Sequence, residues 1–508
     1  MNPSVASLIC ACGIAGLLYL DRDKAVYVSK ALWLPGIWMG LIGSRPLSFW
    51  LGVNASGNVQ VDGSPVDAAA FGVLLAIAIG VLICRKRRTR TLLLTNWPIL
   101  IYFLYCFISV TWSYHPDVAF KRWIKAIGDL AMALVIATDG QPIAAIRRLV
   151  SRIGMFLFPT SVLFIEYYGD LGRAYTSDGA RVNTGVTDNK NSLGLIVLLI
   201  LLVVLWNVRS LLIHKDDPNR SRRLVAQGTL LSFGLALLWM ARCSTCIACF
   251  ILGSFLIIAS NLRAIRKRPA RVHVLCSAML LAAAAILLLG GQGDVANALG
   301  RQSDLSGRTE IWAAVIPAVP NSIVGAGFES FWISPNVRIF QRTLLSLGWY
   351  PPLVNVLNEA HNGYIEMYLN LGWVGVCLIA LVLIGGYRRA CRAFQRDPEL
   401  GSLFLAYIAA GAVYSITEAG FRMMNPSWIF LLLATVSASG VTVGLFGGQK
   451  PKSRVSRGGV LSETAGSNKI IPEGETVHTA RRVLNAINSA TNRRFEPNLQ
   501  SRWTSSHR

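Results

Sequence analysis

Long apolar blocks with almost no charge recur along this chain and constrain its fold more than any other feature. Most are about 18–22 residues long, the length that a helix needs to cross ~30 Å of hydrocarbon. A helix satisfies its own backbone hydrogen bonds, so the blocks predict membrane helices rather than barrel strands. The sequence therefore predicts an all-α polytopic membrane protein with about 12–13 transmembrane helices. The predicted spans lie near residues 4–20, 31–43, 67–84, 91–112, 126–138, 153–168, 192–213, 224–241, 244–261, 272–291, 364–386, 401–420 and 425–446.

Composition agrees with a membrane protein. Hydrophobic residues make up 53% of the 508 positions and charged residues only 15%, with a mean hydropathy of +0.48. The formal net charge of +23 is compatible with nucleic-acid binding. However, membrane proteins also collect Lys and Arg in their cytoplasmic loops, and that explanation suits an apolar chain better. The sequence therefore predicts no nucleic-acid partner.

The basic residues also predict the orientation of the chain. Every second connection between spans is basic: these connections hold 24 Lys or Arg in 63 residues, against 13 in 142 for the others. The positive-inside rule places the basic set in the cytoplasm. Both polar loops, 169–191 and 292–363, then lie outside the cytoplasm, and the chain ends inside.

These patterns divide the chain into three parts. Residues 1–168 form amino-terminal membrane helices, and residues 169–446 form a membrane region that includes both polar outside loops. Residues 447–508 carry 11 Lys or Arg against 4 acidic residues and have no sustained apolar period. This last part is predicted to be a disordered, basic cytoplasmic tail that lies near anionic lipid.

The predicted spans themselves carry little chemistry. Asp129 and Glu166 are the main ionisable residues near span ends, and Glu418 lies at the outer edge of the twelfth span. Proton- or ion-coupled transporters usually need charged groups at mid-membrane, so the pattern argues against a pump. Cysteines 243, 246 and 249 have CxxCxxC spacing without His or acidic neighbours. Small packing residues of a helix are therefore favoured over a metal site.

The larger outside loop contains an arginine at the predicted start of a helix. Ser306 is expected to be the N-cap, and the helical spacing of Ile311 and Val315 predicts that a helix follows. Arg308 then falls in the first turn, where free N–H groups and the helix dipole favour an anion. A solvated surface arginine is the alternative.

The loops also offer a candidate base and further cations. His361, between Glu359 and Asn362, directly precedes the eleventh span and has the ingredients of a general base; an interfacial histidine held by its neighbours is the alternative. In the smaller loop, Arg181 and Lys190 precede the seventh span. Guanidinium groups pair bidentately with phosphate oxygens, so this loop is a candidate phosphate-binding segment.

Taken together, these segments resemble the O-antigen ligase and polysaccharide polymerase superfamily of bacterial inner-membrane proteins. The resemblance covers about residues 170 to 425, and Ser44-Arg45-Pro46 through Trp50 resembles its exopolysaccharide-production branch. The motifs that carry the resemblance are Arg181-x-Asn-x-Gly with Asn189 to Gly194, Ser306-Gly-Arg308-x-x-x-Trp312, Gly325-x-Gly-x-x-Ser-Phe331, Ala360-His361-Asn-x-Tyr364 with Gly372-x-x-Gly375, and Thr417-Glu418.

The resemblance implies a metal-independent glycosyltransferase with a GT-C-like fold, without a cofactor, whose donor is a glycan on undecaprenyl diphosphate. Arg181 and Arg308 would bind the diphosphate, and His361 would activate the acceptor hydroxyl. Either Glu359 or Asn362 would orient the imidazole, with Glu418 as a second candidate. The implied substrate-binding residues are Glu359, Asn362, Tyr364, Glu418, Asn189 and Lys190.

Three functions remain open at this point. The first is a polymerase that joins lipid-linked repeat units into an exopolysaccharide in the bacterial inner membrane. The second is a ligase that transfers finished polymer to lipid A core, and the third is a flippase or exporter without enzymatic activity. Membrane lipid is a partner in each case, and polysaccharide export and chain-length proteins are further candidate partners.

Overall fold

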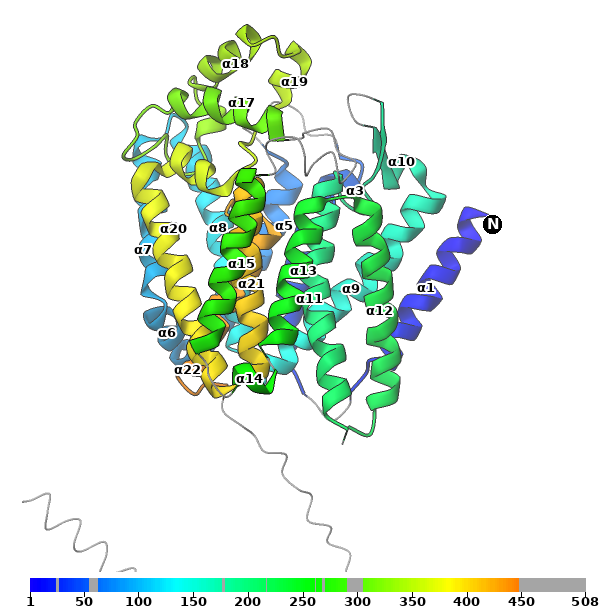
Figure 1. Ribbon diagram of the computed structural model, residues 1–508. Helices are drawn as coiled ribbons and strands as arrows, with labels where there is room; N and C mark the ends of the chain where they lie inside the picture. The colour runs from blue at the N-terminus through cyan, green and yellow to red at the C-terminus, as the bar shows by residue number, and fades with distance from the viewer. Residues whose placement is uncertain are drawn as a thin grey trace, which may run out of the picture. The chain divides into compact units, whose positions relative to one another are not determined.

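Helices account for nearly all regular structure in the part of the chain that the computed structural model describes, so the predicted all-α fold class is confirmed (Figure 1). The described residues are 1–23, 27–53, 63–175, 179–215, 217–260, 262–266, 270–289 and 305–446. The predicted tail, 447–508, and the first part of the predicted loop, 292–304, lie outside them.

The amino-terminal half contains helices of very different lengths and one short hairpin. Its elements are α1 (Pro3–Leu20), η1 (Lys30–Leu32), α2 (Trp33–Ile42), α3 (Leu47–Trp50), α5 (Pro65–Cys84), α6 (Lys86–Thr95), α7 (Trp97–Ile108), η2 (Ser109–Trp112), α8 (Pro116–Ala137), α9 (Pro142–Tyr167), α10 (Gly169–Gly172), β1 (Arg173–Tyr175), β2 (Arg181–Asn183) and α11 (Lys190–Ile213). Strands β1 and β2 pair antiparallel, with Tyr175 opposite Arg181.

The carboxyl-terminal half carries the long helices α20 and α21. Its elements are α12 (Arg220–Ala241), α13 (Ser244–Ala259), α14 (Arg263–Arg266), α15 (Ala270–Leu289), α17 (Leu305–Val315), η3 (Ile316–Ala318), η4 (Phe331–Ile333), α18 (Val337–Ser346), α19 (Pro351–Val356), α20 (Gly363–Arg396), α21 (Pro398–Thr417) and α22 (Pro426–Thr442). The helices α17, α18 and α19 lie together at one end of the bundle, so the larger loop is partly helical, as predicted (Figure 1).

Among the described residues, seven helices are long and apolar enough to cross a membrane: α1, α5, α9, α11, α12, α20 and α21. An eighth span exists if the pair Lys86–Thr95 and Trp97–Trp112, bent by 86°, counts as one. Three shorter apolar helices, Lys30–Ile42, Ser244–Ala259 and Pro426–Thr442, coincide with predicted spans. The predicted segments 126–138 and 272–291 overlap α8 and α15, which end at Ala137 and Leu289. The structure therefore describes a multi-pass membrane protein with seven or eight candidate spans, and the count of 12–13 stays a prediction.

Burial distinguishes central from peripheral helices. The apolar windows of α11 and α21 are 72% and 78% buried inside the protein, against 11% for α1 and 17% for α5. Because α21 packs against α13, α20 and α22, its carboxyl-terminal end lies amid the bundle. A second, smaller core fixes the larger loop through buried residues such as Ile311, Phe331 and Phe340.

Candidate functional site

Glu418, directly after α21, is the carboxylate at which the charged side chains of the site meet. It is only 5% exposed. Its Oε1 accepts hydrogen bonds from Arg308 Nη2 at 3.0 Å and from Asn191 Nδ2 at 3.3 Å. Its Oε2 lies 3.5 Å from His361 Nδ1. One buried carboxylate therefore joins α11, the larger loop and the end of α21.

Arg308 lies in the first turn of α17, as the sequence predicted. The helix begins at Leu305, so Ser306 is its second residue and the prediction of Ser306 as N-cap was wrong. The Arg308 guanidinium donates to the Thr417 carbonyl as well as to Glu418. Arginine has five N–H donors, so these two contacts leave donors for a further anion.

His361 lies between two carboxylates in strained backbone. Its φ is +50°, in the left-handed region. Its Nδ1 is 2.9 Å from Glu359 Oε1, in addition to the 3.5 Å approach to Glu418. Burial lowers the pKa of His361, but the hydrogen bonds and negative charges of Glu359 and Glu418 outweigh burial and raise the pKa to about 9. At pH 7, the imidazole is therefore mostly protonated.

Glu359 and Asn362 were the two residues first suggested to orient His361, and Glu359 is the one that contacts the imidazole. The side chain of Asn362 instead caps α20 and accepts from the backbone N–H groups of Tyr364 at 2.9 Å and Ile365 at 3.1 Å. The Tyr364 hydroxyl donates to the Ala412 carbonyl at 3.1 Å. Asn362 and Tyr364 thus stabilise the start of α20, directly after His361. A role for them in binding substrate stays a prediction.

A cavity of about 900 Å³ lies beside this cluster and brings the smaller loop into the site. Its lining includes His361, Glu418, Asn189 and Lys190. The Asn189 side chain accepts from Ser192 N at 2.8 Å and caps α11, of which Lys190 is the first residue. Asn189 and Lys190 therefore lie with His361 around one cavity, and their role in binding substrate stays a prediction.

Arg181 is not brought into this network. It begins strand β2 and is exposed, and its side chain has no hydrogen bond or ion pair among the described residues. Val182 and Thr184, which follow it along the chain, do line the cavity. Its predicted role in binding diphosphate stays a prediction.

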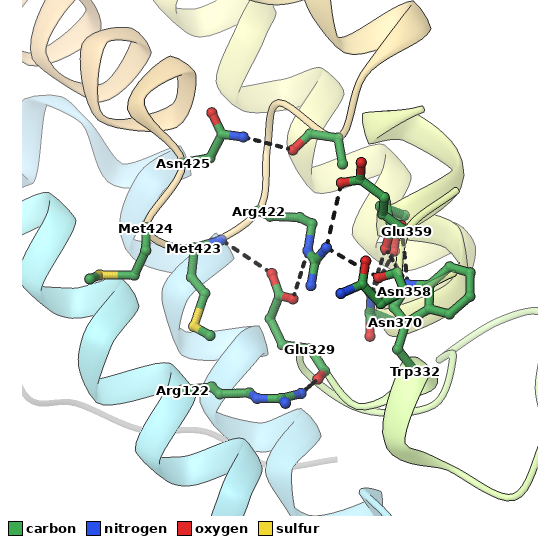
Figure 2. Close-up of polar contacts among 12 residues, drawn as sticks. Arg122, Glu329, Trp332, Asn358, Glu359, Asn370, Arg422, Met423, Met424 and Asn425 are labelled. Carbon is green, nitrogen blue, oxygen red and sulfur yellow. Dashed lines mark hydrogen bonds and ion pairs between the residues drawn. The ribbon is translucent and has the colours of Figure 1, made fainter. Parts of the chain in front are cut away.

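Arg422 is a central cation that the sequence reasoning missed. Figure 2 shows Arg422 between Glu329 and Glu359. Its Nε lies 3.3 Å from Glu329 Oε2, and its Nη1 lies 3.8 Å from Glu359 Oε2 and donates to the Asn358 carbonyl at 3.3 Å. The available signal was that Arg422 is the one basic residue in the short connection 418–426, which is predicted to lie outside the cytoplasm. Arg422 thus holds the carboxylate that contacts His361.

Two buried carboxylates anchor the segment that carries Arg422. Glu329, which is 3% exposed, accepts from Met423 N at 3.1 Å, while its backbone carbonyl accepts from Arg122 (Figure 2). Asp129, noted in the sequence without a role, accepts from Trp38 Nε1 at 3.1 Å and from Met424 N at 2.8 Å. Both carboxylates satisfy backbone N–H groups of this connection and so position Arg422.

Glu366 is another buried carboxylate, and the sequence reasoning overlooked it within the predicted span 364–386. It is fully buried and accepts from Trp332 Nε1 at 3.0 Å and from Ala360 N at 2.5 Å. An acidic residue one turn into an apolar segment was the available signal. Glu366 fixes the backbone directly before His361.

The arrangement also bears on metal binding. Donor atoms of Glu359, His361 and Glu418 all lie within 4.8 Å of one another, so these three residues could hold a metal ion. Each carboxylate already faces a guanidinium, Arg422 for Glu359 and Arg308 for Glu418. The expectation of a metal-independent site stays a prediction.

Comparison with known proteins supports the resemblance. Residues 227–380 match the family model described as "O-Antigen ligase". The chain is also 24% identical over 315 residues to the "Exopolysaccharide production protein ExoQ" of Rhizobium meliloti (strain 1021). The aligned region covers 59% of this chain and 67% of the relative. The match agrees with the exopolysaccharide-production branch predicted from the motifs. The predicted resemblance to the O-antigen ligase family is therefore confirmed, over residues 227–380 of this multi-pass membrane protein.

Proposed function

We propose that this protein is a glycosyltransferase of the bacterial inner membrane that polymerises undecaprenyl-diphosphate-linked repeat units into an exopolysaccharide. The observation that carries the proposal is the pairing at Glu418, which contacts both Arg308, the proposed phosphate-binding cation, and His361, the proposed proton-transfer group. Glu418 and His361 also line one cavity. The match to an exopolysaccharide production protein supports this product class. The site faces the periplasm and the tail the cytoplasm, as the distribution of basic residues favours.

In the proposed reaction, the acceptor hydroxyl oxygen forms a new bond to the anomeric carbon of the donor. The bond from that carbon to the diphosphate oxygen breaks, and its electron pair leaves with undecaprenyl diphosphate. Arg308 stabilises the growing negative charge through its remaining N–H donors, with Arg181 and Lys190 as further cations. Stabilisation of charge that develops in the transition state is usually the largest catalytic contribution.

The proton of the acceptor hydroxyl passes to His361, which Glu359 and Glu418 orient. A positioned general base typically contributes roughly 10²–10⁴-fold in rate. Because the pKa of His361 is raised to about 9, only its minor neutral form can accept this proton at neutral pH. The proposal therefore requires a rate that increases with pH up to about 9.

We propose that the reaction needs no metal ion, because guanidinium groups supply the positive charge next to the carboxylates. Transfer measured after treatment with a chelator should equal that of untreated protein. A loss that added divalent metal restores would instead assign Glu359, His361 and Glu418 as metal ligands.

The family match favours a second candidate, a ligase that transfers polymer to lipid A core. Deletion of the gene, followed by sizing of secreted and lipid-linked glycan, separates the two. We expect single repeat units on the lipid carrier; long polymer on undecaprenyl diphosphate would instead show a ligase.

Complementation of the deletion strain tests catalysis against transport. His361→Ala should fail to restore polymer, whereas a flippase would not need a base at this position. His273→Ala is the matched control, because His273 contacts Tyr387 and lies outside the cavity. Full complementation by a stably inserted His361→Ala protein would refute the catalytic proposal.

A further inference from the structure

Two cysteines near the candidate site, Cys243 and Cys246, are in direct contact with each other. The sulfur atoms of Cys243 and Cys246 are 3.0 Å apart, and the residues are only 4% and 0% exposed. A disulfide bond has a sulfur–sulfur length of about 2.04 Å, so a movement of roughly 1 Å separates this contact from a covalent bond. The two thiols are already arranged as a pair.

The local structure resembles that of a reactive dithiol. Cys243 is the N-cap of α13, and Cys246 is the third residue of that helix, in the sequence Cys-Ser-Thr-Cys. Cysteines with this spacing at a helix amino terminus have a favoured thiolate form, because the helix dipole stabilises negative charge. The hydrogen bond between the sulfurs lowers the pKa of Cys243. The first thiol therefore has the character needed for thiol–disulfide exchange.

Close packing confines the two sulfurs. A Cβ atom on Gly194 of α11 would lie 2.8 Å from Cys243 Cβ and 3.1 Å from Cys246 Sγ. Only glycine permits this approach of α11 to α13. Once the helices have packed, the pair is therefore buried, and oxidation has to occur during assembly.

A short chain of contacts connects the pair to the candidate site. Between the cysteines, Thr245 Oγ1 forms a hydrogen bond of 2.9 Å with Thr417 Oγ1. The Thr417 carbonyl accepts from Arg308, and Glu418 is the next residue. A covalent link across the first turn of α13 would hold Thr245 against the end of α21, where Arg308 is bound.

A thiolate metal site is a poorer interpretation. Among the described residues, the group of three potential ligands with close donor atoms is Glu359, His361 and Glu418, and it contains no cysteine. Cys249, one turn further along α13, directs its thiol to the Ala410 carbonyl at 3.7 Å. The structure thus presents two paired sulfurs rather than a metal-binding triad.

We propose that Cys243 and Cys246 form a dithiol–disulfide modification site that is oxidised as the protein assembles. A thiolate of the pair attacks the disulfide of an oxidant of the thiol-oxidase class and displaces one of its sulfurs. The second thiolate then attacks the mixed disulfide, so that the Cys243–Cys246 bond forms. The oxidant takes up two electrons and leaves as two thiols, with the two protons of the cysteines. The predicted orientation places the pair on the outer, oxidising side of the membrane, and the bond itself does not depend on the proposed function.

Sequential thiol labelling of the full-length protein tests the proposal. Cells are quenched with acid, and the protein is denatured and treated with one maleimide. It is then reduced and treated with a second, isotopically heavier maleimide. In the peptides, Cys243 and Cys246 should carry the second label, and the other eight cysteines the first. Denaturation removes differences in burial, so the second label reports oxidation alone.

The variant Cys243→Ser provides an internal control. Cys246 and Cys249 have the same spacing of three residues but no sulfur contact in the structure. In this variant Cys246 should switch to the first label. The first label on both Cys243 and Cys246 of the wild type would refute the proposal, and so would persistent protection of Cys246 in Cys243→Ser.

Discussion

The pairing of His361 with two carboxylates leads to a quantitative prediction for Glu418→Gln. This change removes one negative charge next to the imidazole and keeps a side chain of nearly the same shape. The rise in the pKa of His361 from 6.5 to about 9 corresponds to roughly 3 kcal/mol. Glu359 lies closer to His361 Nδ1 than Glu418 does, at 2.9 Å against 3.5 Å. Glu418 should therefore account for less than half of this rise in pKa. Glu418→Gln should therefore lower the pKa of His361 by about one pH unit.

The sign of the effect on activity follows from the role of His361. A base must be neutral, so the rate should be low at pH 7 and rise through the pKa. Half of the maximal kcat/KM should be reached near pH 9 in the wild type and about one pH unit lower in Glu418→Gln. The maximal rate of the variant should also fall, because Arg308 loses its carboxylate partner.

Transfer of a labelled repeat unit in proteoliposomes, from about pH 6 to about pH 10, measures this profile. Glu310→Gln is a matched control, because Glu310 is exposed and contacts Trp349 instead of His361. In His361→Ala, the rate should fall by about two to four orders of magnitude and lose this pH dependence, while the donor still binds. An identical midpoint in the wild type and Glu418→Gln would refute the reasoning. A rate that declines above pH 9 would show that His361 acts as a cation.

Three further predictions concern the surroundings of the site. Arg308→Lys keeps the charge but loses the planar fork, so turnover should stay clearly impaired; wild-type turnover in the same transfer assay would argue against phosphate binding by Arg308. Asp129→Asn can no longer accept from both Trp38 and Met424, and should destabilise the purified protein by about 1–3 kcal/mol in thermal unfolding, whereas unchanged stability would show that this link is dispensable. Truncation after Gly448 should leave polymer formation largely intact, because the composition of residues 449–508 predicts too little apolar surface to fold; a stable but inactive truncation would contradict this.

The helices could be predicted from the sequence because hydropathy is a local property. Segments such as 192–213 and 401–420 carry their signal within about 20 residues, and the structure has helices in both places. The position of Arg308 in the first turn of α17 was also predictable from the sequence. With Ser306 as N-cap the helix would begin at residue 307, whereas α17 begins at Leu305, and this two-residue error reflects the weak sequence signal of a helix boundary.

The electrostatic partners within the site could not be predicted in the same way. Arg308 and Glu418 are 110 residues apart in sequence, and Arg422 and Glu329 are 93 apart. Such pairs depend on how α17 and the end of α21 are placed by packing. The motifs therefore predicted which loops carry the candidate residues, and the structure then connected Glu418 to His361 directly and Arg422 to His361 through Glu359.

The glycine motif after His361 shows how one residue can place a loop. Gly372 interrupts α20 with φ +63° and ψ −163°, a conformation that is essentially restricted to glycine. At this break, Trp373 N donates to the Ser322 carbonyl at 2.9 Å, and Val374 N donates to the Ile323 carbonyl at 3.2 Å. The broken helix therefore binds the Gly-x-Gly segment that leads to Glu329.

Gly372→Ala tests this interpretation. A Cβ atom on Gly372 would lie 2.2 Å from the backbone carbonyl of Ile323, and the backbone conformation itself costs about 1–3 kcal/mol for other residues. The two segments must then separate, so we expect a loss of at least ~2 kcal/mol of stability in the purified protein, together with lower transfer activity. Gly385→Ala, in the same helix, is the control, because its Cβ would come close only to the end of the flexible Arg389 side chain, at 2.7 Å, and would make an ordinary contact of 3.7 Å with Pro98. Equal thermal stability of the two variants would show that the break at Gly372 does not hold the loop.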